Sequence, residues 1–317
     1  MTRPPLRLLF CGTPAFAVPS LEHLLAQPDF QVTAVITQPD RPRGRGREIS
    51  SPAIKQAALR ANIPVFQPDK IRSIESEQFL REHNSDVIVI IAYGQIIPAR
   101  LLGIPRFGWI NLHASLLPRY RGAAPVQWAI ANGETVTGVT SMRIDAGMDS
   151  GDVILQTETP IGPEETAPRL AERLAELGAP LIAETLRGLR DGTLQAKPQN
   201  PSGRTAAPLL TKADGLIDWD RPAQVIYNRL RGFTPWPGAY SVFRGTTCHL
   251  MGQPASNSHD AAVPGRIFYD GRQLLVACGE QSFFRVSHVK QEGRRQVSAA
   301  EFANGARLQP GEQFGGA

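Results

Sequence analysis

The chain has 317 residues, of which 42% are hydrophobic and 20% charged, and this length favours two globular domains over one. No segment approaches the roughly 18 uninterrupted apolar residues of a membrane span, and Arg7 and Gly12 interrupt the apolar run near the N-terminus, which excludes a membrane-embedded or secreted protein. Three widely spaced cysteines (Cys11, Cys248 and Cys278) argue against a disulfide framework and favour a reducing cytoplasm.

The positive charge of the chain is concentrated in its second part. Residues 197–317 carry 14 Lys and Arg against 9 Asp and Glu, and so hold the whole net charge of +5, whereas residues 1–196 carry 20 of each. A basic second domain beside a neutral first one suggests a polyanionic partner. A mildly basic, solvated surface is the alternative interpretation.

Residues 6–190 alternate between short apolar runs and amphipathic stretches. We expect strands at residues 6–11, 30–37, 64–66, 87–92, 109–113, 137–144 and 153–159, and helices at residues 52–61, 74–82, 125–131 and 164–189. Thr13 is expected to cap a further helix with Pro14 at its first position. This alternation predicts an α/β domain with a Rossmann-like, doubly wound, mostly parallel sheet.

The composition changes at residue 191. Residues 191–209 are rich in Gly, Pro, Ser, Gln and Asn without a hydrophobic period, which indicates a linker. One amphipathic helix then fits residues 222–231. Short β-rich runs follow at residues 239–243, 248–251, 266–269, 274–278 and 283–289, with a hairpin signal at Asp270-Gly271 and a capping box at residues 298–301. We therefore expect a first domain at residues 1–190 and a small OB-like β-barrel, a fold that often binds nucleic acid, at residues 210–317.

The first turn of the α/β domain reads Cys11-Gly12-Thr13-Pro14. It is not the Gly-x-Gly-x-x-Gly that holds a dinucleotide, and no phosphate-binding Lys loop occurs in the chain, so a nicotinamide cofactor is not expected. Because Cys11 ends an apolar strand, we expect a buried small residue there and not a nucleophile.

A candidate active site follows from Asn111, His113 and Asp149. Asn111 and His113 lie two residues apart, so on a strand they point to the same side, at the carboxyl end where α/β sheets bind ligands. Asp149 lies between Gly147 and Gly151, which let the backbone approach a ligand closely. An imidazole, a carboxylate and an amide donor suit the addition of a nucleophile to a carbonyl.

Three alternatives bear on this site. His113 alone could be a structural histidine. Metal binding by the three residues is disfavoured because Asn is a poor ligand and no Cys or second His is near, so we expect no metal. Ser115 lacks the Gly-x-Ser-x-Gly elbow of an acylated nucleophile, so the attacking group is expected to belong to a substrate.

The segment Asn111–Gly122, which reads NLHASLLPRYRG, resembles the signature of formyltransferases that use 10-formyltetrahydrofolate, and Gly147–Gly151 matches its second half. Within that superfamily the chain resembles the family that acts on methionyl-tRNA. The supporting motifs are Phe10–Pro14, Thr37–Pro42, Ala92–Pro98, Ile217–Trp219 and Pro235–Pro237. The resemblance covers nearly the whole chain, with Tyr120 where the family usually has Trp.

The resemblance implies that the α-amino group of methionine on initiator tRNA attacks the formyl carbon of 10-formyltetrahydrofolate. Asn111 and protonated His113 match the residues that stabilise the oxyanion, and Asp149 matches the residue that orients His113. The folate-contacting positions would be Ser115, Leu116, Leu117 and Pro118, with Tyr93, Gly94, Gln95, Ile96, Asp145, Gly147 and Met148 lining the pterin pocket.

Arg41, Arg43, Arg45 and Arg47 alternate with Pro and Gly, so we expect a mobile loop that does not pack as an element. In the family a basic insertion here reaches the acceptor stem of the tRNA, and Arg suits phosphate contact and stacking on unpaired bases. A disordered, solvated loop is the alternative.

Two rival functions remain. One is a formyltransferase that uses the same folate on a small or sugar-nucleotide amine, which would not need four arginines in this loop. The other is a non-catalytic RNA-binding protein with a degenerate transferase domain, against which the intact Asn111, His113 and Asp149 argue. Since no long, exposed apolar segment indicates a subunit interface, we expect a monomer.

Overall fold

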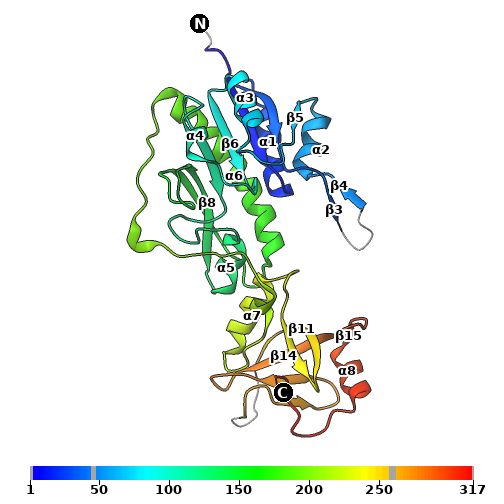
Figure 1. Cartoon of the computed structure of the whole chain (residues 1–317). Coiled ribbons are helices and arrows are strands. Elements are labelled where there is room, and N and C mark those ends of the chain that lie inside the picture. The colour runs from blue at the N-terminus through cyan, green and yellow to red at the C-terminus, as the bar shows by residue number, and fades with distance from the viewer. Residues whose placement is uncertain (1–2, 44–47, 257–261, 316–317) are drawn as a thin grey trace. The chain divides into compact units, whose positions relative to one another are not determined.

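The structure is a computed structural model that describes residues 3–43, 48–256 and 262–315 (Figure 1). Its contacts divide the chain into two compact units. The first unit comprises residues 1–125, 136–160 and 170–208, and the second comprises residues 126–135, 161–169 and 209–317. Two short segments that precede residue 170 thus group with the C-terminal residues, and the domain boundaries expected from the sequence stay a prediction.

A seven-stranded sheet forms the centre of the first unit, in the order β5-β2-β1-β6-β7-β8-β9. Its strands are β1 (Leu6–Gly12), β2 (Phe30–Ile36), β5 (Val65–Phe66), β6 (Val87–Ile91), β7 (Trp109–His113), β8 (Val136–Arg143) and β9 (Val153–Pro160). The strands from β5 to β7 are parallel, while β8 and β9 are antiparallel to their neighbours. This arrangement confirms the predicted α/β fold with a mostly parallel sheet.

Helices accompany the strands in alternation along the chain, as Figure 1 shows. They are α1 (Val18–Leu25), α2 (Ala53–Arg60), α3 (Ile74–Glu82), α4 (Ala99–Leu102), α5 (Pro125–Ala131) and α6 (Ala167–Asp191). Every residue of β6 is buried, as expected for a central parallel strand covered on both faces. The sheet therefore offers its strand ends and the loops beyond them for a ligand.

The helix cap expected at Thr13 is wrong. Residues Ala15–Ala17 form a 3-10 turn with Pro14 as its N-cap, and α1 begins only at Val18. The hydroxyl of Thr13 instead donates a hydrogen bond to the backbone oxygen of Tyr93 at 2.9 Å. This bond ties the turn after β1 to the loop after β6, at one edge of the sheet.

The arginine-rich segment is also more ordered than expected. Its ends form an antiparallel hairpin of β3 (Arg41–Arg43) and β4 (Glu48–Ser50), which Figure 1 shows beside α2. Asp40 anchors the base of the hairpin, because its carboxylate accepts hydrogen bonds from Lys55 at 2.7 Å and Gln67 at 2.8 Å. The predicted tRNA-contacting residues Arg45 and Arg47 lie outside the described residues.

An antiparallel half-barrel forms the second unit, in the order β10-β11-β14-β13-β12 with β15 paired to β14. Its elements are α7 (Ala223–Gly232), β10 (Tyr240–Phe243), β11 (Thr246–Ala255), β12 (Ile267–Tyr269), β13 (Leu274–Ala277), β14 (Phe283–Gln291), β15 (Val297–Ser298) and α8 (Ala299–Ala306). The predicted hairpin between β12 and β13 and the predicted capping box before α8 are both confirmed.

Residues 312–315 span the open side of the half-barrel. The amide of Gly315 donates to the backbone oxygen of Val242 in β10, and the oxygen of Glu312 accepts from the amide of Ile267 in β12, each at 2.8 Å. This segment also brings Phe314 into the core. The two edge strands are thus joined by a third piece of chain, and not by pairing with each other.

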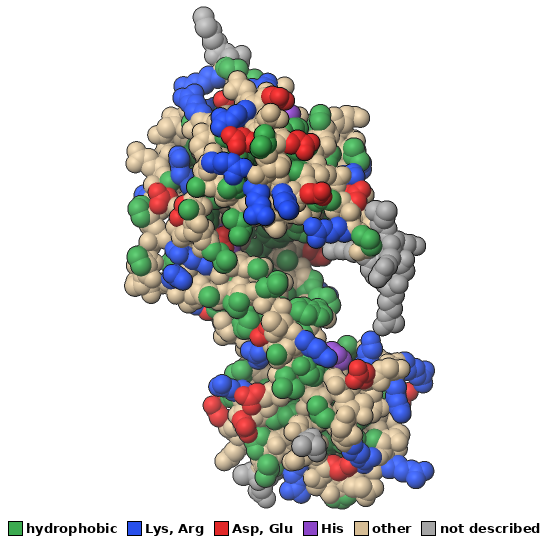
Figure 2. All heavy atoms as spheres, in the orientation of Figure 1, with side chains coloured by type: hydrophobic (Ala, Val, Ile, Leu, Met, Phe, Trp, Pro, Cys, Tyr) green, Lys and Arg blue, Asp and Glu red, His purple; other side chains and the backbone are tan. Residues whose placement is uncertain are grey.

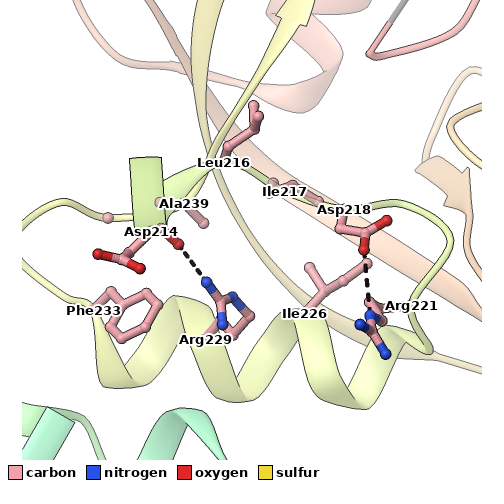
Figure 3. A pocket seen from close by; sticks show the side chains of 11 residues that line it. Asp214, Leu216, Ile217, Asp218, Arg221, Ile226, Arg229, Phe233 and Ala239 are labelled. Carbon is pink, nitrogen blue, oxygen red and sulfur yellow. Dashed lines mark hydrogen bonds and ion pairs between the residues drawn. The ribbon is translucent and has the colours of Figure 1, made fainter. Parts of the chain in front are cut away.

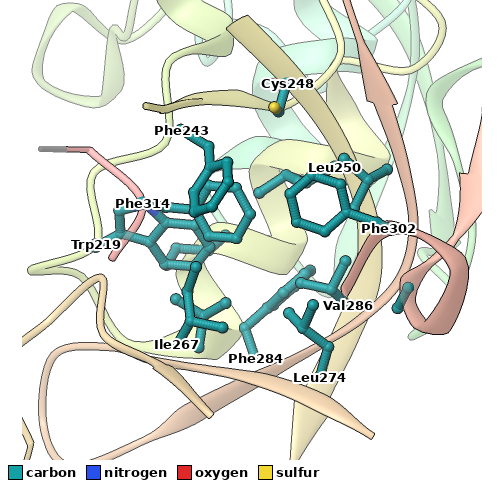
Figure 4. Close-up of a cluster of buried hydrophobic side chains, with 14 of the residues drawn as sticks. Trp219, Phe243, Cys248, Leu250, Ile267, Leu274, Phe284, Val286, Phe302 and Phe314 are labelled. Atoms are coloured by element: carbon teal, nitrogen blue, oxygen red, sulfur yellow. The ribbon is translucent and has the colours of Figure 1, made fainter. Parts of the chain in front are cut away.

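Aromatic side chains fill the half-barrel. Trp219, Phe243, Phe302 and Phe314 lie together in Figure 4, and all are buried. The indole nitrogen of Trp219 donates to the hydroxyl of Ser241 at 3.0 Å, so its one polar atom is satisfied. The second unit therefore has a hydrophobic core of its own.

Candidate active site

His113 lies at the carboxyl end of β7, where its ring is held from one side by the backbone. Its side chain is only 6% exposed, and Nε2 lies 2.9 Å from the backbone oxygen of Tyr120. Because a carbonyl oxygen only accepts hydrogen bonds, Nε2 carries a proton in this arrangement. The other ring nitrogen, Nδ1, is then the one available for chemistry.

Asp149 faces that second nitrogen. One carboxylate oxygen, Oδ1, lies 3.7 Å from Nδ1 of His113, and the other, Oδ2, accepts a hydrogen bond from the amide of Gly122 at 2.8 Å. Asp149 adopts the left-handed backbone conformation, with φ +48°. A proton on Nδ1 would therefore form an imidazolium–carboxylate pair.

Asn111 supplies an amide with unused hydrogen-bonding capacity. It lies two residues before His113 on the same strand, so the two side chains share a face of the sheet. Its side chain is half-buried and makes no hydrogen bond to the residues that the structure describes. An N–H donor held next to an imidazole is suited to stabilise negative charge on a carbonyl oxygen.

The route of the loop that carries Asp149 is not obvious from the sequence. Strand β8 runs antiparallel to β7, so Arg143 at its end lies opposite Ile110, near the amino end of β7. The loop of residues 144–152 begins there, with the amide of Ile144 bonded to the oxygen of Trp109 at 2.9 Å. It must return along β7 before Asp149 meets His113. The His113–Asp149 separation therefore depends on the conformation of this loop.

The predicted folate-contacting segment Ser115–Pro118 forms a tight turn beyond β7. The hydroxyl of Ser115 donates to the oxygen of Arg119 at 2.6 Å, which occupies it in its own loop and agrees with its rejection as a nucleophile. The amide of Leu117 is bonded to the hydroxyl of Thr140 at 3.1 Å, which fixes the turn to β8.

The loop of Tyr93, Gly94, Gln95 and Ile96 follows β6. Tyr93 is 2% exposed, its hydroxyl has no hydrogen-bond partner among the described residues, and burial raises its pKa far above the ordinary value, so it stays neutral. Gln95 accepts a hydrogen bond from the amide of Ile71 at 2.7 Å. Ile96 is 88% exposed, although large apolar side chains are usually covered.

The residues Asp145, Gly147 and Met148 are exposed on the loop before Asp149. The carboxylate of Asp145 accepts hydrogen bonds from the hydroxyl of Ser150 at 2.9 Å and from the amide of Gly147 at 3.0 Å. These bonds shape the loop, while Met148, 72% exposed, presents its apolar side chain to solvent.

A cavity of about 720 Å³ adjoins this end of the sheet in the first unit. Its wall includes Tyr93 and Gly94, which were predicted to contact folate, together with Arg41, which was predicted to contact tRNA. Pro14 and Pro52 also line it. The volume lies within the range of pockets that hold small molecules.

Other features of the described residues do not compete with this site. The cavity beside α7, bordered by Asp214, Arg229 and Phe233 in Figure 3, has a volume of about 20 Å³, room for little more than one water molecule. Cys11 is fully buried and burial raises its pKa, which confirms it as a core residue. Within the described ranges there is no cluster of three His, Cys, Asp or Glu to hold a metal, and no helix long and apolar enough to cross a membrane.

Sequence reasoning missed the supporting role of Gly122. Its amide holds Asp149, and its φ of +124° is reserved for glycine. A Cβ at this position would also lie 2.5 Å from the backbone oxygen of Ala207. The position of this glycine after Arg121 at the end of the signature segment was the available signal.

Comparison with known proteins identifies the family. Residues 6–186 match the model of the formyl transferase family, and residues 209–307 match that of its C-terminal domain. The chain is 51% identical over 310 residues to the methionyl-tRNA formyltransferase of Solibacter usitatus, covering 98% of this chain and 99% of that protein. It is 48% identical over 311 residues to that of Acidobacterium capsulatum, covering 98% and 100%.

Among solved structures, the chain resembles WlaRD, a sugar 3N-formyl transferase studied in the presence of dTDP and 5-N-formyl-THF. The TM-score is 0.64 at 20% sequence identity, over 92% of this chain and 99% of the other, a likeness of fold alone. The identity of about half of all residues over nearly the full length is far more specific. On that ground, the chain belongs to the methionyl-tRNA formyltransferase family.

Proposed function

We propose that this chain transfers the formyl group of 10-formyltetrahydrofolate to the α-amino group of methionyl initiator tRNA, in support of translation initiation. The observation that carries the proposal is the approach of Asp149 to His113 at 3.7 Å, with Asn111 on the same strand as His113 and without a hydrogen bond to the described residues. The substrates are inferred from membership of the family, and the catalytic roles are inferred from these three side chains.

The transfer begins when the amine attacks the formyl carbon and a C–N bond forms. The formyl oxygen becomes an oxyanion, which accepts hydrogen bonds from the amide of Asn111 and from Nδ1–H of His113. When the intermediate collapses, the bond to N10 of the folate breaks, N10 takes up a proton and the amine loses one. Asp149 compensates the positive charge on His113 through these steps.

The folate is proposed to contact Ser115–Pro118, Tyr93–Ile96 and Asp145–Met148. Ile96 and Met148 each expose a large apolar side chain on these loops, which an aromatic ring bound there would cover. The backbone of both loops offers amides and carbonyls for the polar edge of a pterin. The cavity bordered by Tyr93 and Arg41 is large enough to admit one end of a substrate.

The tRNA is proposed to contact the β3–β4 hairpin through Arg41, Arg43, Arg45 and Arg47. Arg41 borders the same cavity as Tyr93 and Gly94, and its guanidinium is suited to bind a phosphate. Replacing all four arginines by alanine is expected to weaken tRNA binding and to flatten its salt dependence. Unchanged affinity and salt slope would assign the segment to solvent exposure alone.

The C-terminal unit is proposed as a second tRNA contact. A groove of about 430 Å³ there is bordered by Arg244, Arg294 and Arg295, all three of which are exposed. On the face of this unit drawn in Figure 2, Lys and Arg side chains are spread over the surface. Such a distribution suits the phosphate backbone, which is bound without regard to sequence.

A folate-dependent transfer to a sugar-nucleotide amine is the rival reading, favoured only by the fold shared with WlaRD at 20% identity. The test compares initial rates with 10-formyltetrahydrofolate and either methionyl-tRNA or a dTDP-amino sugar. We expect formylation of the tRNA and loss of this activity in His113→Ala. His83→Ala serves as the control, because its ring follows α3 and, among the described residues, hydrogen-bonds only to the backbone oxygen of Phe79 in that helix. Preference for the amino sugar would overturn the proposal.

A further inference from the structure

Residues 197–207, within the segment expected to be a linker, are hydrogen-bonded to other parts of the first unit. The amide of Arg121 donates to the oxygen of Thr205 at 2.9 Å, and the amide of Ala207 donates to the oxygen of Arg121 at 2.7 Å. Lys197 exchanges two backbone hydrogen bonds with Val153 at the start of β9. Figure 1 shows this extended yellow-green segment between α6 and α7.

Gln199 uses the full hydrogen-bonding capacity of its side chain on the loops around the active site. Its Nε2 donates to the backbone oxygens of Asp149 at 2.8 Å and Gly151 at 2.7 Å. Its Oε1 accepts from Nε and Nη2 of Arg121 at 3.1 and 2.6 Å. Two donors and two acceptor positions are thus all satisfied, and the direction of the amide is fixed because carbonyls only accept and guanidinium only donates.

These bonds converge on the pair His113 and Asp149. Arg121, held by Gln199, stands between Tyr120, whose oxygen meets Nε2 of His113, and Gly122, whose amide meets the carboxylate of Asp149. On its other side Gln199 holds the backbone of Asp149 itself. One side chain therefore links the piece of chain that fixes the imidazole to the loop that carries the carboxylate.

We propose that Gln199 is a positioning residue that sets the separation between His113 and Asp149. The loop of residues 144–152 starts at the far end of β7, so it needs such a fixed point where it returns. Glycines at 147 and 151 make the loop pliable, and Gln199 restrains it at Gly151 and Asp149. The proposal rests on the catalytic roles proposed above for His113 and Asp149.

Substitution by glutamate tests separately the two contacts of Gln199, one with Arg121 and one with the loop of residues 144–152. In Gln199→Glu the side chain keeps its bond to Arg121, and that bond gains charge. Its second oxygen, however, faces the carbonyls of Asp149 and Gly151, which cannot donate, so the loop is repelled. Gln199→Ala removes both contacts. Asn200→Ala is the matched control, since among the described residues that amide bonds only to Ser202 in its own turn.

The test measures kcat and KM for formyl transfer in the full chain, with thermal unfolding to verify folding. We expect both Gln199 variants to lose about 10- to 100-fold in kcat, with KM for both substrates within about threefold, because misplacement of the pair affects the reacting geometry and not substrate binding. Asn200→Ala should match the wild type.

A double substitution shows whether Gln199 acts through Asp149. We expect Gln199→Ala to cost less than about threefold when added to Asp149→Asn, because the interaction that it sets is already lost. Full additivity, or wild-type kcat in both Gln199 variants while Asp149→Asn is impaired, would overturn the positioning role alone. Wild-type kcat in Asp149→Asn would overturn the proposed catalytic role and the positioning role with it.

Discussion

Replacement of Asp149 by asparagine removes one charge while keeping the shape of the side chain. The bond from the amide of Gly122 to Oδ2, at 2.8 Å, can be kept by the carbonyl oxygen of the asparagine. Its NH₂ group then faces Nδ1 of His113 and favours a ring that carries a lone pair there. Because Nε2–H points to Tyr120, the variant leaves no N–H of His113 free for the formyl oxygen.

The size of the effect follows from the separation of the pair. At 3.7 Å, an imidazolium and a carboxylate attract by about 4 kcal/mol for an effective dielectric constant of about 20. Water reaches Asp149, which is 20% exposed, so we expect the transition state to lose about 2–4 kcal/mol. This corresponds to a fall in kcat of about 30- to 1000-fold. KM for the folate should change by less than about threefold.

The assay is the initial rate of methionyl-tRNA formylation at saturating 10-formyltetrahydrofolate. Asp152→Asn is the matched control, because it removes the same charge three residues later and its side chain makes no hydrogen bond to the described residues. Both variants should unfold within about 2 °C of the wild type. A kcat for Asp149→Asn within threefold of the wild type would refute the role of the charge.

Three further outcomes are expected. Gly122→Ala should lower the free energy of unfolding by about 2–3 kcal/mol, measured by denaturant titration, and should reduce kcat. The reason is that the φ of +124° and a backbone oxygen 2.5 Å from the new Cβ both oppose a side chain. Replacing Arg294 and Arg295 by Glu should weaken tRNA binding and reduce the slope of log affinity against log salt concentration by about one to two units, measured by filter binding. An unchanged slope would show that the groove is not part of the tRNA interface. Hydrogen bonds from Arg187 hold the pKa of Asp29 below its usual value, so this pair stabilises the fold above pH of about 4, and its contribution is lost as pH falls through the lowered pKa. The free energy of unfolding of Asp29→Asn should therefore be about 1 kcal/mol below that of the wild type at neutral pH, and this difference should vanish in acid.

Local rules were sufficient for most elements of the fold. The apolar run at β6, the capping box at Ser298 and the turn at Asp270-Gly271 each follow from signals within a few residues, and all three are present. Thr13 failed as a cap because its hydroxyl has a better partner, the oxygen of Tyr93, 80 residues away in the chain. Such a choice depends on tertiary contacts that no local pattern records.

Some residues of the candidate site also follow from local rules, while others depend on tertiary contacts. Asn111 and His113 could be placed together because strand geometry fixes residues two apart on one face. The approach of Asp149 could not be derived from spacing, since its loop leaves from the opposite end of β7 and returns. Gln199 gave no signal at all, because a polar residue in a Pro-rich stretch is typical of a linker.

The bridge made by residues 312–315 bears on how the C-terminal unit tolerates shortening. A polypeptide cut before Glu312 would leave the amide of Ile267 and the oxygen of Val242 without partners, and would withdraw Phe314 from the aromatic cluster. Loss of the chain from Glu312 onward would thus open the half-barrel along both edges. An insertion or fusion in this region therefore has to leave residues 312–315 in place.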